Sequence, residues 1–292
     1  MEEDATRNQR HLMINIKKNI QRHPVSSYFT LVFLIAWGGS IAGGWAQFHQ
    51  GKVLDLIDII PMALAMLIAP IFGGIVMTYT CDGKNGIQDL ISRMTNWNVG
   101  IRWYAVLFIF PILILITIVP LSIWVTPELK PTFFPIGILM GLLAGFIEEI
   151  GWMGFVYPKM RLKLSALQAS IFLGFLHALW HLAADFLGNY QAFGKNWLPY
   201  FAGFIVFIVA LRVLIAWVYE NTKSLLLAQL IHASSSGFLG ILVPLSNTGL
   251  SWVIFYAVYA FALWVFASII IIRHSTHLRE QPTFVKANKT SG

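Results

Sequence analysis

The sequence contains very little charge. Only 11% of its 292 residues are Asp, Glu, Lys or Arg, against about 25% in an ordinary soluble domain. A soluble fold of this length cannot cover its surface with so few charges, which excludes a cytosolic globular enzyme, and the high apolar content excludes a disordered chain. The chain has one cysteine, Cys81, which excludes an internal disulfide framework and a multi-cysteine metal cage. The class of protein that these absences leave is one that crosses a membrane several times.

Long apolar runs fill most of the chain. Apolar residues make up 57% of it and the mean hydropathy is +0.70. A helical span needs about 20 mostly apolar residues, and these runs are too long and too irregular for transmembrane strands. A stretch of mixed polarity at 83–99 predicts an amphipathic helix on the inner membrane surface. The sequence therefore predicts an all-α polytopic bundle of about eight transmembrane helices, at residues 26–48, 53–79, 103–125, 132–156, 166–187, 197–219, 224–245 and 251–272.

Basic residues predict the orientation of these spans. With the N-terminus in the cytoplasm, 16 of the 20 Lys and Arg residues fall in inner segments, only Lys52, Lys130 and Lys195 fall outside, and Arg212 lies within the sixth predicted span. This bias predicts a multi-pass cell-membrane protein with both termini cytoplasmic. We expect a basic segment at 1–25, without a removable signal peptide, one transmembrane domain at 26–273 and a tail at 274–292. The basic ends are expected to contact anionic membrane lipids, not nucleic acid.

Two adjacent glutamates follow a stripe of glycines in the fourth predicted span. Gly137, Gly141 and Gly145 recur every four residues, and such a stripe lets a neighbouring helix approach closely. Glu149 continues the stripe and Glu148 flanks it, because successive helical residues differ by about 100°. Since a membrane-embedded charge costs roughly 2.5–3.5 kcal/mol, the pair indicates function. A purely structural pair, bonded to backbone or at a wet edge, is the alternative.

Histidines occupy two other spans. His177, His181 and Asp185 are spaced by four residues in the fifth span and therefore share a helix face. Asp185 either orients His181 or lies at the outer edge of the membrane. In the seventh span, Ser236 is four residues beyond His232 and faces the same way. Each histidine alone is equally compatible with a hydrogen bond between helices, and the serines with close helix packing.

Glutamates and histidines from three helices can meet inside a bundle and perform one of two kinds of chemistry. They can hold a divalent metal such as Zn, with Glu148, His181 and His232 as the candidate ligands. Alternatively, a glutamate acts as general base on a water molecule while histidines bind the reacting carbonyl. Both arrangements predict hydrolysis within the membrane. The H-E-x-x-H motif of soluble zinc proteases is absent from the sequence.

These segments, in this order, resemble the CPBP family of CAAX prenyl proteases and bacteriocin-processing or immunity proteins, which are abortive-infection-type glutamate intramembrane proteases. The family motif Glu-Glu-x-x-x-Arg resembles residues 148–153, with Met153 in place of arginine. The second motif, an aromatic residue, three others and histidine, resembles 174–182 with His181 as its histidine and His177 in the aromatic position. A rival register makes His177 the motif histidine and lacks the aromatic.

The third motif and the flanking segments extend the resemblance. His232 matches the histidine of a His-x-x-x-Asn motif, with Ser236 in place of asparagine. Residues 82–104 resemble the cytoplasmic helix typical of the family, and the family core is expected at about 132–245. The resemblance implies an eight-helix bundle around a partly wet cavity.

In that cavity, Glu148 would activate water, and His181 and His232 would hold the water or bind the substrate carbonyl. The resemblance leaves open whether a metal is bound. Met153 cannot pair with Glu149 as arginine would, and Ser236 reaches less far than asparagine.

The predicted function is that of an intramembrane endopeptidase acting on a membrane-associated protein or peptide, prenylated or bacteriocin-like. Two alternatives remain from the sequence. The substitutions at Met153 and Ser236 suggest a noncatalytic immunity or scaffold protein of the same family. Membrane carboxylates and histidines also build proton relays, which suggests a proton-coupled transporter, although the sequence lacks a detectable internal repeat.

Overall fold

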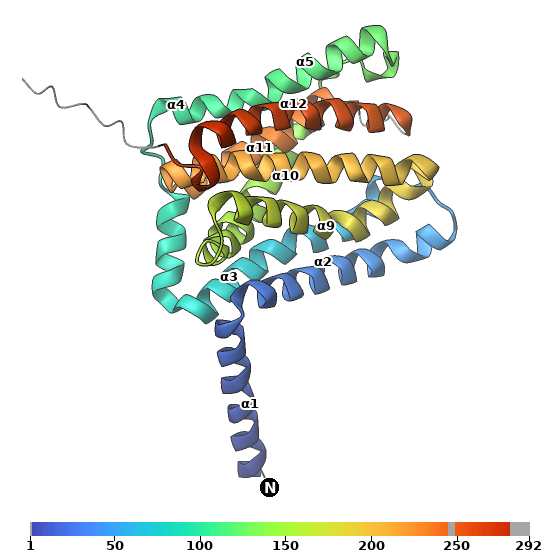
Figure 1. The fold of residues 1–292 in the computed structure, drawn as a ribbon. Helices are drawn as coiled ribbons and strands as arrows, with labels where there is room; N and C mark the ends of the chain where they lie inside the picture. Colours follow the sequence, from blue (N-terminus) through green and yellow to red (C-terminus); the bar gives the residue numbers. More distant parts are fainter. Residues whose placement is uncertain (1, 245–248, 281–292) are drawn as a thin grey trace, which may run out of the picture.

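The computed structural model describes residues 2–244 and 249–280, and every regular element in these ranges is helical. The first helix, α1 (Glu2–Arg22), extends away from a bundle that the remaining helices form (Figure 1). The bundle consists of α2 (Pro24–His49), α3 (Leu56–Met94), α4 (Ile101–Tyr104), α5 (Ile109–Trp124), α6 (Ile136–Leu143), α7 (Glu149–Gly151), α8 (Tyr157–Met160), α9 (Ala166–Phe193), α10 (Trp197–Thr222), α11 (Leu225–Leu242) and α12 (Leu250–His274).

Seven helical segments of the described chain are long and apolar enough to cross a membrane. The longest, Ala166–Thr222, has 57 residues and contains both α9 and α10, which a short 3₁₀ turn at Gly194–Asn196 separates. Gly194 has φ +53°, which reverses the chain so that the two helices pack side by side (Figure 1). Each of the eight predicted spans thus has a helical counterpart, and the predicted all-α, polytopic membrane bundle is confirmed.

The helix boundaries differ from the predicted ones in several places. α3 joins the second span to the predicted amphipathic segment, and it bends at Gly83, where φ is +66° and ψ is −154°. Beyond the bend, α3 turns across the end of the bundle from which α1 and the last residues of α12 emerge (Figure 1). The helix α1 was not predicted from the sequence. α11 ends at Leu242, and the predicted end of that span, at 245, lies outside the described residues.

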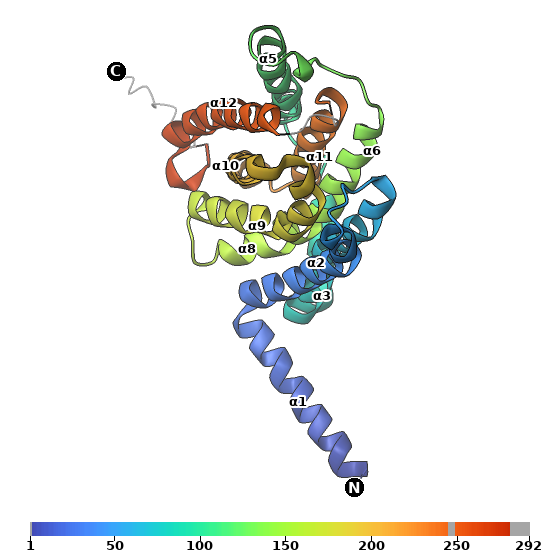
Figure 2. The same ribbon diagram turned by 90° about the vertical axis from the view of Figure 1, so that its right-hand side faces the viewer.

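Helix α10 lies at the centre of the bundle. Seen end-on, it is surrounded by α9, α11 and α12 (Figure 2), and it packs against each of them. Most of its residues are buried on all sides, as expected for a helix that is apolar all round. Two charged residues of α10 are therefore buried as well: Arg212, with no exposed surface, and Glu220, with 5%.

The glycine stripe of the fourth span packs against α11. A Cβ added to Gly137 would lie 2.6 Å from the amide nitrogen of Ile241, and one added to Gly145 would lie 2.6 Å from that of Ala233. Only glycine lets the two backbones come this close, so the predicted close approach of a neighbouring helix is confirmed. This contact brings His232 of α11 beside Glu149.

Candidate active site

The helix that carries the two glutamates is widened twice. The π-helical segment Ala144–Glu148 precedes the short α7, and a second π-helical segment, Trp152–Val156, follows it. Such segments are rare, and where they occur they frequently mark functional sites. Arg93, from the part of α3 beyond the bend, donates a hydrogen bond of 2.9 Å to the carbonyl oxygen of Gly154 in the second segment. The two π-helical segments change the direction in which residues before and after them point.

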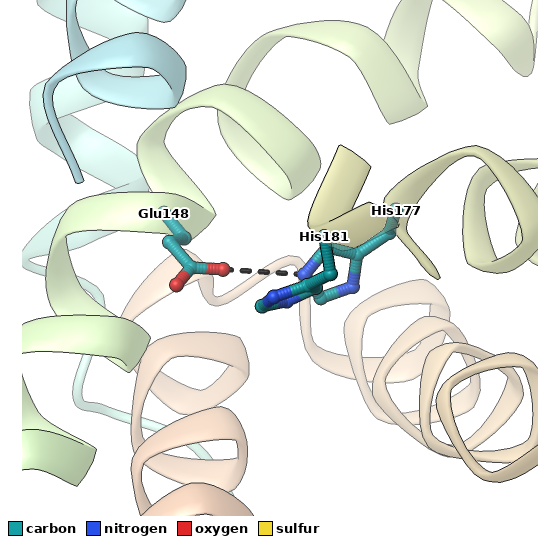
Figure 3. A group of neighbouring side chains, drawn as sticks. All are labelled: Glu148, His177 and His181. Atoms are coloured by element: carbon teal, nitrogen blue, oxygen red, sulfur yellow. Dashed lines mark hydrogen bonds and ion pairs between the residues drawn. The ribbon is translucent and has the colours of Figure 1, made fainter. Parts of the chain in front are cut away.

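Glu148 faces the histidines of α9. Its Oε2 accepts a hydrogen bond of 3.3 Å from the indole N–H of Trp152 and lies 3.2 Å from Nε2 of His177 (Figure 3). Nε2 of His232 lies 4.0 Å from the same oxygen. The side chain of Glu148 is only 7% exposed. A single carboxylate oxygen is therefore surrounded by nitrogen atoms from three helical segments.

Glu149 contacts Arg212 of α10 and the Nδ1 side of the ring of His232. Its Oε1 accepts a hydrogen bond of 2.5 Å from Nη1 of Arg212 and lies 2.7 Å from Nδ1 of His232. Its side chain is fully buried. Its second oxygen, Oε2, has no hydrogen-bond partner in the described part of the chain. Glu149 thus links α10 and α11 through one oxygen only.

These contacts define which nitrogen of each histidine carries the proton. Nδ1 of His177 lies 3.1 Å from both Nε and Nη2 of Arg212. A guanidinium only donates hydrogen bonds, so this Nδ1 is an acceptor, and in the neutral ring the proton lies on Nε2, facing Glu148. Nδ1 of His232 donates to the carboxylate of Glu149. Nε2 of His232 therefore presents a lone pair toward Glu148.

His181 and Ser236 lie beside this group without joining its hydrogen bonds. The ring of His181 lies 5.2 Å from that of His177 and 5.1 Å from that of Phe204. Neither His181 nor Ser236, which is half-buried one turn beyond His232, has a side-chain hydrogen bond within the described residues. Of the predicted site residues, the structure brings together Glu148, Glu149, His177 and His232. Of the two histidines of α9, the one that contacts Glu148 through a hydrogen bond is His177.

Asp185 does not orient His181. Its two oxygens accept hydrogen bonds of 2.8 Å from the indole of Trp197, 2.9 Å from the hydroxyl of Tyr200 and 3.1 Å from the amide of Asn189. These partners come from α9 and α10 themselves, near the turn that joins the two helices. Of the two readings that the sequence left open, the structure supports an edge residue that fastens α9 to α10.

Two contributors to the site, Arg212 and Trp152, were assigned no role from the sequence. Arg212 was recognisable as a cation inside a span, and the cost of placing it there was the available signal. Its partners could not be predicted because they lie on two other helices. Trp152 falls inside the Glu-Glu motif, four residues after Glu148, a spacing that places it on the same side of a helix.

One group of side chains lies close enough together to hold a metal ion. One ligand atom from each of Glu148, His177 and His181 lies within 4.8 Å of the others (Figure 3). The predicted ligand set had His232 in place of His177. His232 is not part of this group, although its Nε2 lies 4.0 Å from Oε2 of Glu148. Imidazole and carboxylate are ligands that suit Zn.

The hydrogen bonds of His177 do not fit a metal ligand, however. A ligating histidine offers one lone pair to the metal, and its other nitrogen donates its N–H to an acceptor. In His177 the nitrogen away from Glu148 faces Arg212, which can only donate. Nε2 therefore carries the proton and has no lone pair for a metal. The group is near enough to hold an ion but is not arranged to do so.

The chain is similar to known membrane proteases over the part that contains this site. Residues 130–238 match the family described as type II CAAX prenyl endopeptidase Rce1-like. The chain is also 27% identical over 224 residues to CAAX prenyl protease 2 of Methanococcus maripaludis, covering 70% of this chain and 80% of that protein. Over these residues the chain is therefore similar to the type II CAAX prenyl endopeptidases. The resemblance that the motifs predicted is confirmed, and both the matched family and the relative are described as proteases.

The region that matches this family includes nearly all of the polar site. It extends from before Glu148 to just beyond Ser236, and so contains the two glutamates, His177 and His232. Arg212 also lies within it. The site described above therefore lies in the part of the chain that is similar to this family.

Proposed function

We propose that this protein hydrolyses a peptide bond of a membrane-associated, prenylated protein, with Glu148 as the general base that activates water. The observation that carries the proposal is the position of Glu148. It is a buried carboxylate inside a membrane-spanning bundle, held by two N–H donors, with the lone pair of His232 4.0 Å from it. The prenylated substrate is inferred from the family and from the name of the archaeal relative.

The proposed reaction uses Glu148 twice. Glu148 takes a proton from a water molecule, and the water oxygen attacks the carbonyl carbon of the scissile bond. As the C–N bond breaks, Glu148 returns the proton to the leaving amine. The N–H groups of Trp152 and His177 hold the carboxylate in place, and Nε2 of His232 accepts a hydrogen bond from the water.

The carbonyl oxygen gains negative charge in this reaction and needs a hydrogen-bond donor. We assign this role to Ser236, whose hydroxyl lies one turn beyond His232 and replaces the asparagine of the related motif. An oxyanion donor is typically worth about 2.7–4 kcal/mol. His181, whose ring adjoins that of His177, is assigned to the wall of the substrate site. No step requires a metal, in agreement with the protonation of His177.

We also propose that both termini face the cytoplasm. α1 and the last residues of α12 lie at the same end of the bundle (Figure 1), as an even number of spans requires. The basic residues of the segments at 1–25 and 274–292 support the cytoplasmic side for that end. The transmembrane domain at 26–273 would then present the Glu148 site to substrates that arrive from the cytoplasmic leaflet.

The experiment that tests the function compares two buried carboxylates. The full chain in lipid vesicles is given a prenylated peptide, and cleavage is measured for wild type, Glu148→Gln and Glu220→Gln. We expect Glu148→Gln to lose at least about 100-fold in kcat, because a general base contributes about 10²–10⁴-fold. Glu220→Gln, the control, keeps wild-type kcat. An equal kcat for wild type and Glu148→Gln would contradict the role of Glu148, and absence of cleavage by wild type would favour the noncatalytic role.

A further inference from the structure

Arg212 is a buried cation for which the proposed reaction has no direct use. Its side chain has no exposed surface, and all of its described polar contacts are with the site. We propose that Arg212 is a positioning residue. It keeps the proton of His177 on Nε2, where that proton faces Glu148. It also provides, beside Glu149, the guanidinium that the related motif has at the position of Met153. This inference rests on the proposed function and deepens it.

The fold brings Arg212 to this position through a glycine on α9. A Cβ added to Gly174 would lie 2.7 Å from Cα of Val209 and 3.3 Å from Cβ of Arg212. Gly174 therefore lets α10 approach α9 at the level of Arg212. His177 lies three residues beyond Gly174 and faces the same side of α9. The close approach of the two helices thus places the guanidinium against the ring of His177.

The fork of the guanidinium allows both contacts at once. Nε and Nη2 point at Nδ1 of His177, each 3.1 Å away, while Nη1 donates to Glu149. If the proton of His177 moved to Nδ1, it would meet the N–H groups of Arg212. The bare Nε2 would then meet the oxygen of Glu148, acceptor against acceptor. Arg212 opposes this tautomer, so Glu148 keeps a donor from His177.

The second role of Arg212 concerns the charge of Glu149. In the related motif an arginine follows Glu149 by four residues, but here that position is Met153, which is fully buried and has no N–H donor in its side chain. An unpaired buried carboxylate is costly. Arg212 neutralises it from a different helix. The guanidinium of Arg212 on α10 thus compensates for the motif arginine that Met153 replaces.

The test separates the two roles by substituting two residues. Arg212→Met alone leaves Glu149 unpaired, and the protein then risks failing to fold. Arg212→Met combined with Glu149→Gln removes both charges, and the amide carbonyl that Glu149→Gln introduces can still accept from His232. The reference is Glu149→Gln alone, and Leu214→Met, another fully buried position of α10, controls for substitution in this helix. All variants are full-length chains in lipid vesicles.

The first measurement is cleavage of the prenylated peptide. We expect the double variant to have kcat about 100-fold below that of Glu149→Gln alone, because loss of the partner that holds a catalytic histidine in its tautomer has cost up to about 10⁴-fold elsewhere. KM should change less than about threefold, since Arg212 does not touch substrate. Using Arg212→Lys in place of Arg212→Met should restore little of the lost kcat, because an ammonium lacks the planar fork of a guanidinium. A double variant as active as Glu149→Gln alone would overturn the proposal.

The second measurement does not depend on activity. The ¹⁵N NMR spectrum of histidine-labelled protein, with His177 assigned by comparison with His177→Asn, reports which ring nitrogen carries the proton. We expect the proton on Nε2 in wild type and a larger fraction of rings protonated on Nδ1 in the double variant, where Glu148 alone still favours Nε2. A tautomer ratio equal to that of wild type would overturn the proposed role. If Glu148→Gln proved fully active, the proposed function would fail, and the NMR result would still decide whether Arg212 holds His177.

Discussion

Two buried acidic centres in this protein are bonded very differently. Glu220, near the end of α10, uses both carboxylate oxygens, which accept from Tyr157, Arg161, Lys223 and Arg279 at distances of 2.7–3.2 Å. In the Glu148–Glu149 centre, one oxygen of Glu149 has no partner among the described residues, and Nε2 of His232 stands 4.0 Å from Glu148. Both centres are buried, but only the first is saturated with donors.

This difference fits a structural role for Glu220 and the catalytic role proposed for Glu148. Buried polar groups are nearly always hydrogen-bonded, and an incompletely bonded one calls for an explanation. Glu220 joins α8, α10 and the chain after α12, and its oxygens have no acceptor site left for a proton or for the O–H group of a water molecule. The centre at Glu148 keeps acceptor capacity for a substrate or water. Sites of this kind are where proteins depart from the rules that favour stability alone.

The largest effect is expected from breaking the packing that holds the Glu148 centre together. In Gly145→Val, the new Cβ would lie 2.6 Å from the amide nitrogen and 2.8 Å from Cβ of Ala233. α11 must then move away, and His232 moves with it. We expect the free energy of unfolding to fall by about 3 kcal/mol and peptide cleavage to be lost. Gly188→Ala, where a Cβ meets nothing within 4 Å, is the control and should leave both unchanged. Retained cleavage in Gly145→Val would show that the site tolerates a displaced α11.

A smaller effect, on stability only, is expected at the saturated centre. Glu220→Gln removes the charge that three cations share, and we expect the free energy of unfolding in detergent to fall by about 2 kcal/mol, as for loss of hydrogen bonds to a charged group. The kcat of the folded protein should not change. If Glu220→Gln reduced kcat as strongly as Glu148→Gln does, the contrast between the two centres would be wrong.

No effect is expected from removing metal ions. Because Nε2 of His177 carries the proton that faces Glu148, dialysis against a strong chelator should leave cleavage of the prenylated peptide unchanged. Metal analysis of the purified protein, before and after dialysis, provides the control. Activity that disappears with the chelator and returns with Zn would show that His177 changes its protonation to bind an ion at Glu148, His177 and His181.

Much of the fold could be predicted from the sequence. Eight apolar runs of about the length of a membrane identified the helices, because every backbone polar group in a bilayer must be bonded within its own helix. The glycines at 137, 141 and 145 also indicated a close helix contact, and the structure confirms it at α11. For the site, the cost of membrane-embedded charge was sufficient to select Glu148, Glu149 and His232.

Other features could not be predicted because they depend on contacts between distant parts of the chain. The 3.6-residue period does not reveal the π-helical segments around Glu149, which change where residues point. His177 and His181 share one face of α9, so their spacing alone could not show which of them meets Glu148. The related motif places the cationic partner of Glu149 four residues further along the same helix. In this structure the cationic partner is Arg212, which comes from α10.

The sequence by itself determined the class of this protein and the chemical groups available to it. Apolar run length and the scarcity of charge require a helical membrane bundle, since only helices and closed barrels satisfy the backbone in lipid and these runs are too long for barrel strands. Only the tertiary structure decided how those groups are paired. The close approach of α9 to α10 and of α6 to α11 places Arg212 against His177 and His232 against Glu149. These distances depend on which helices pack together, and no local pattern in the chain encodes that choice.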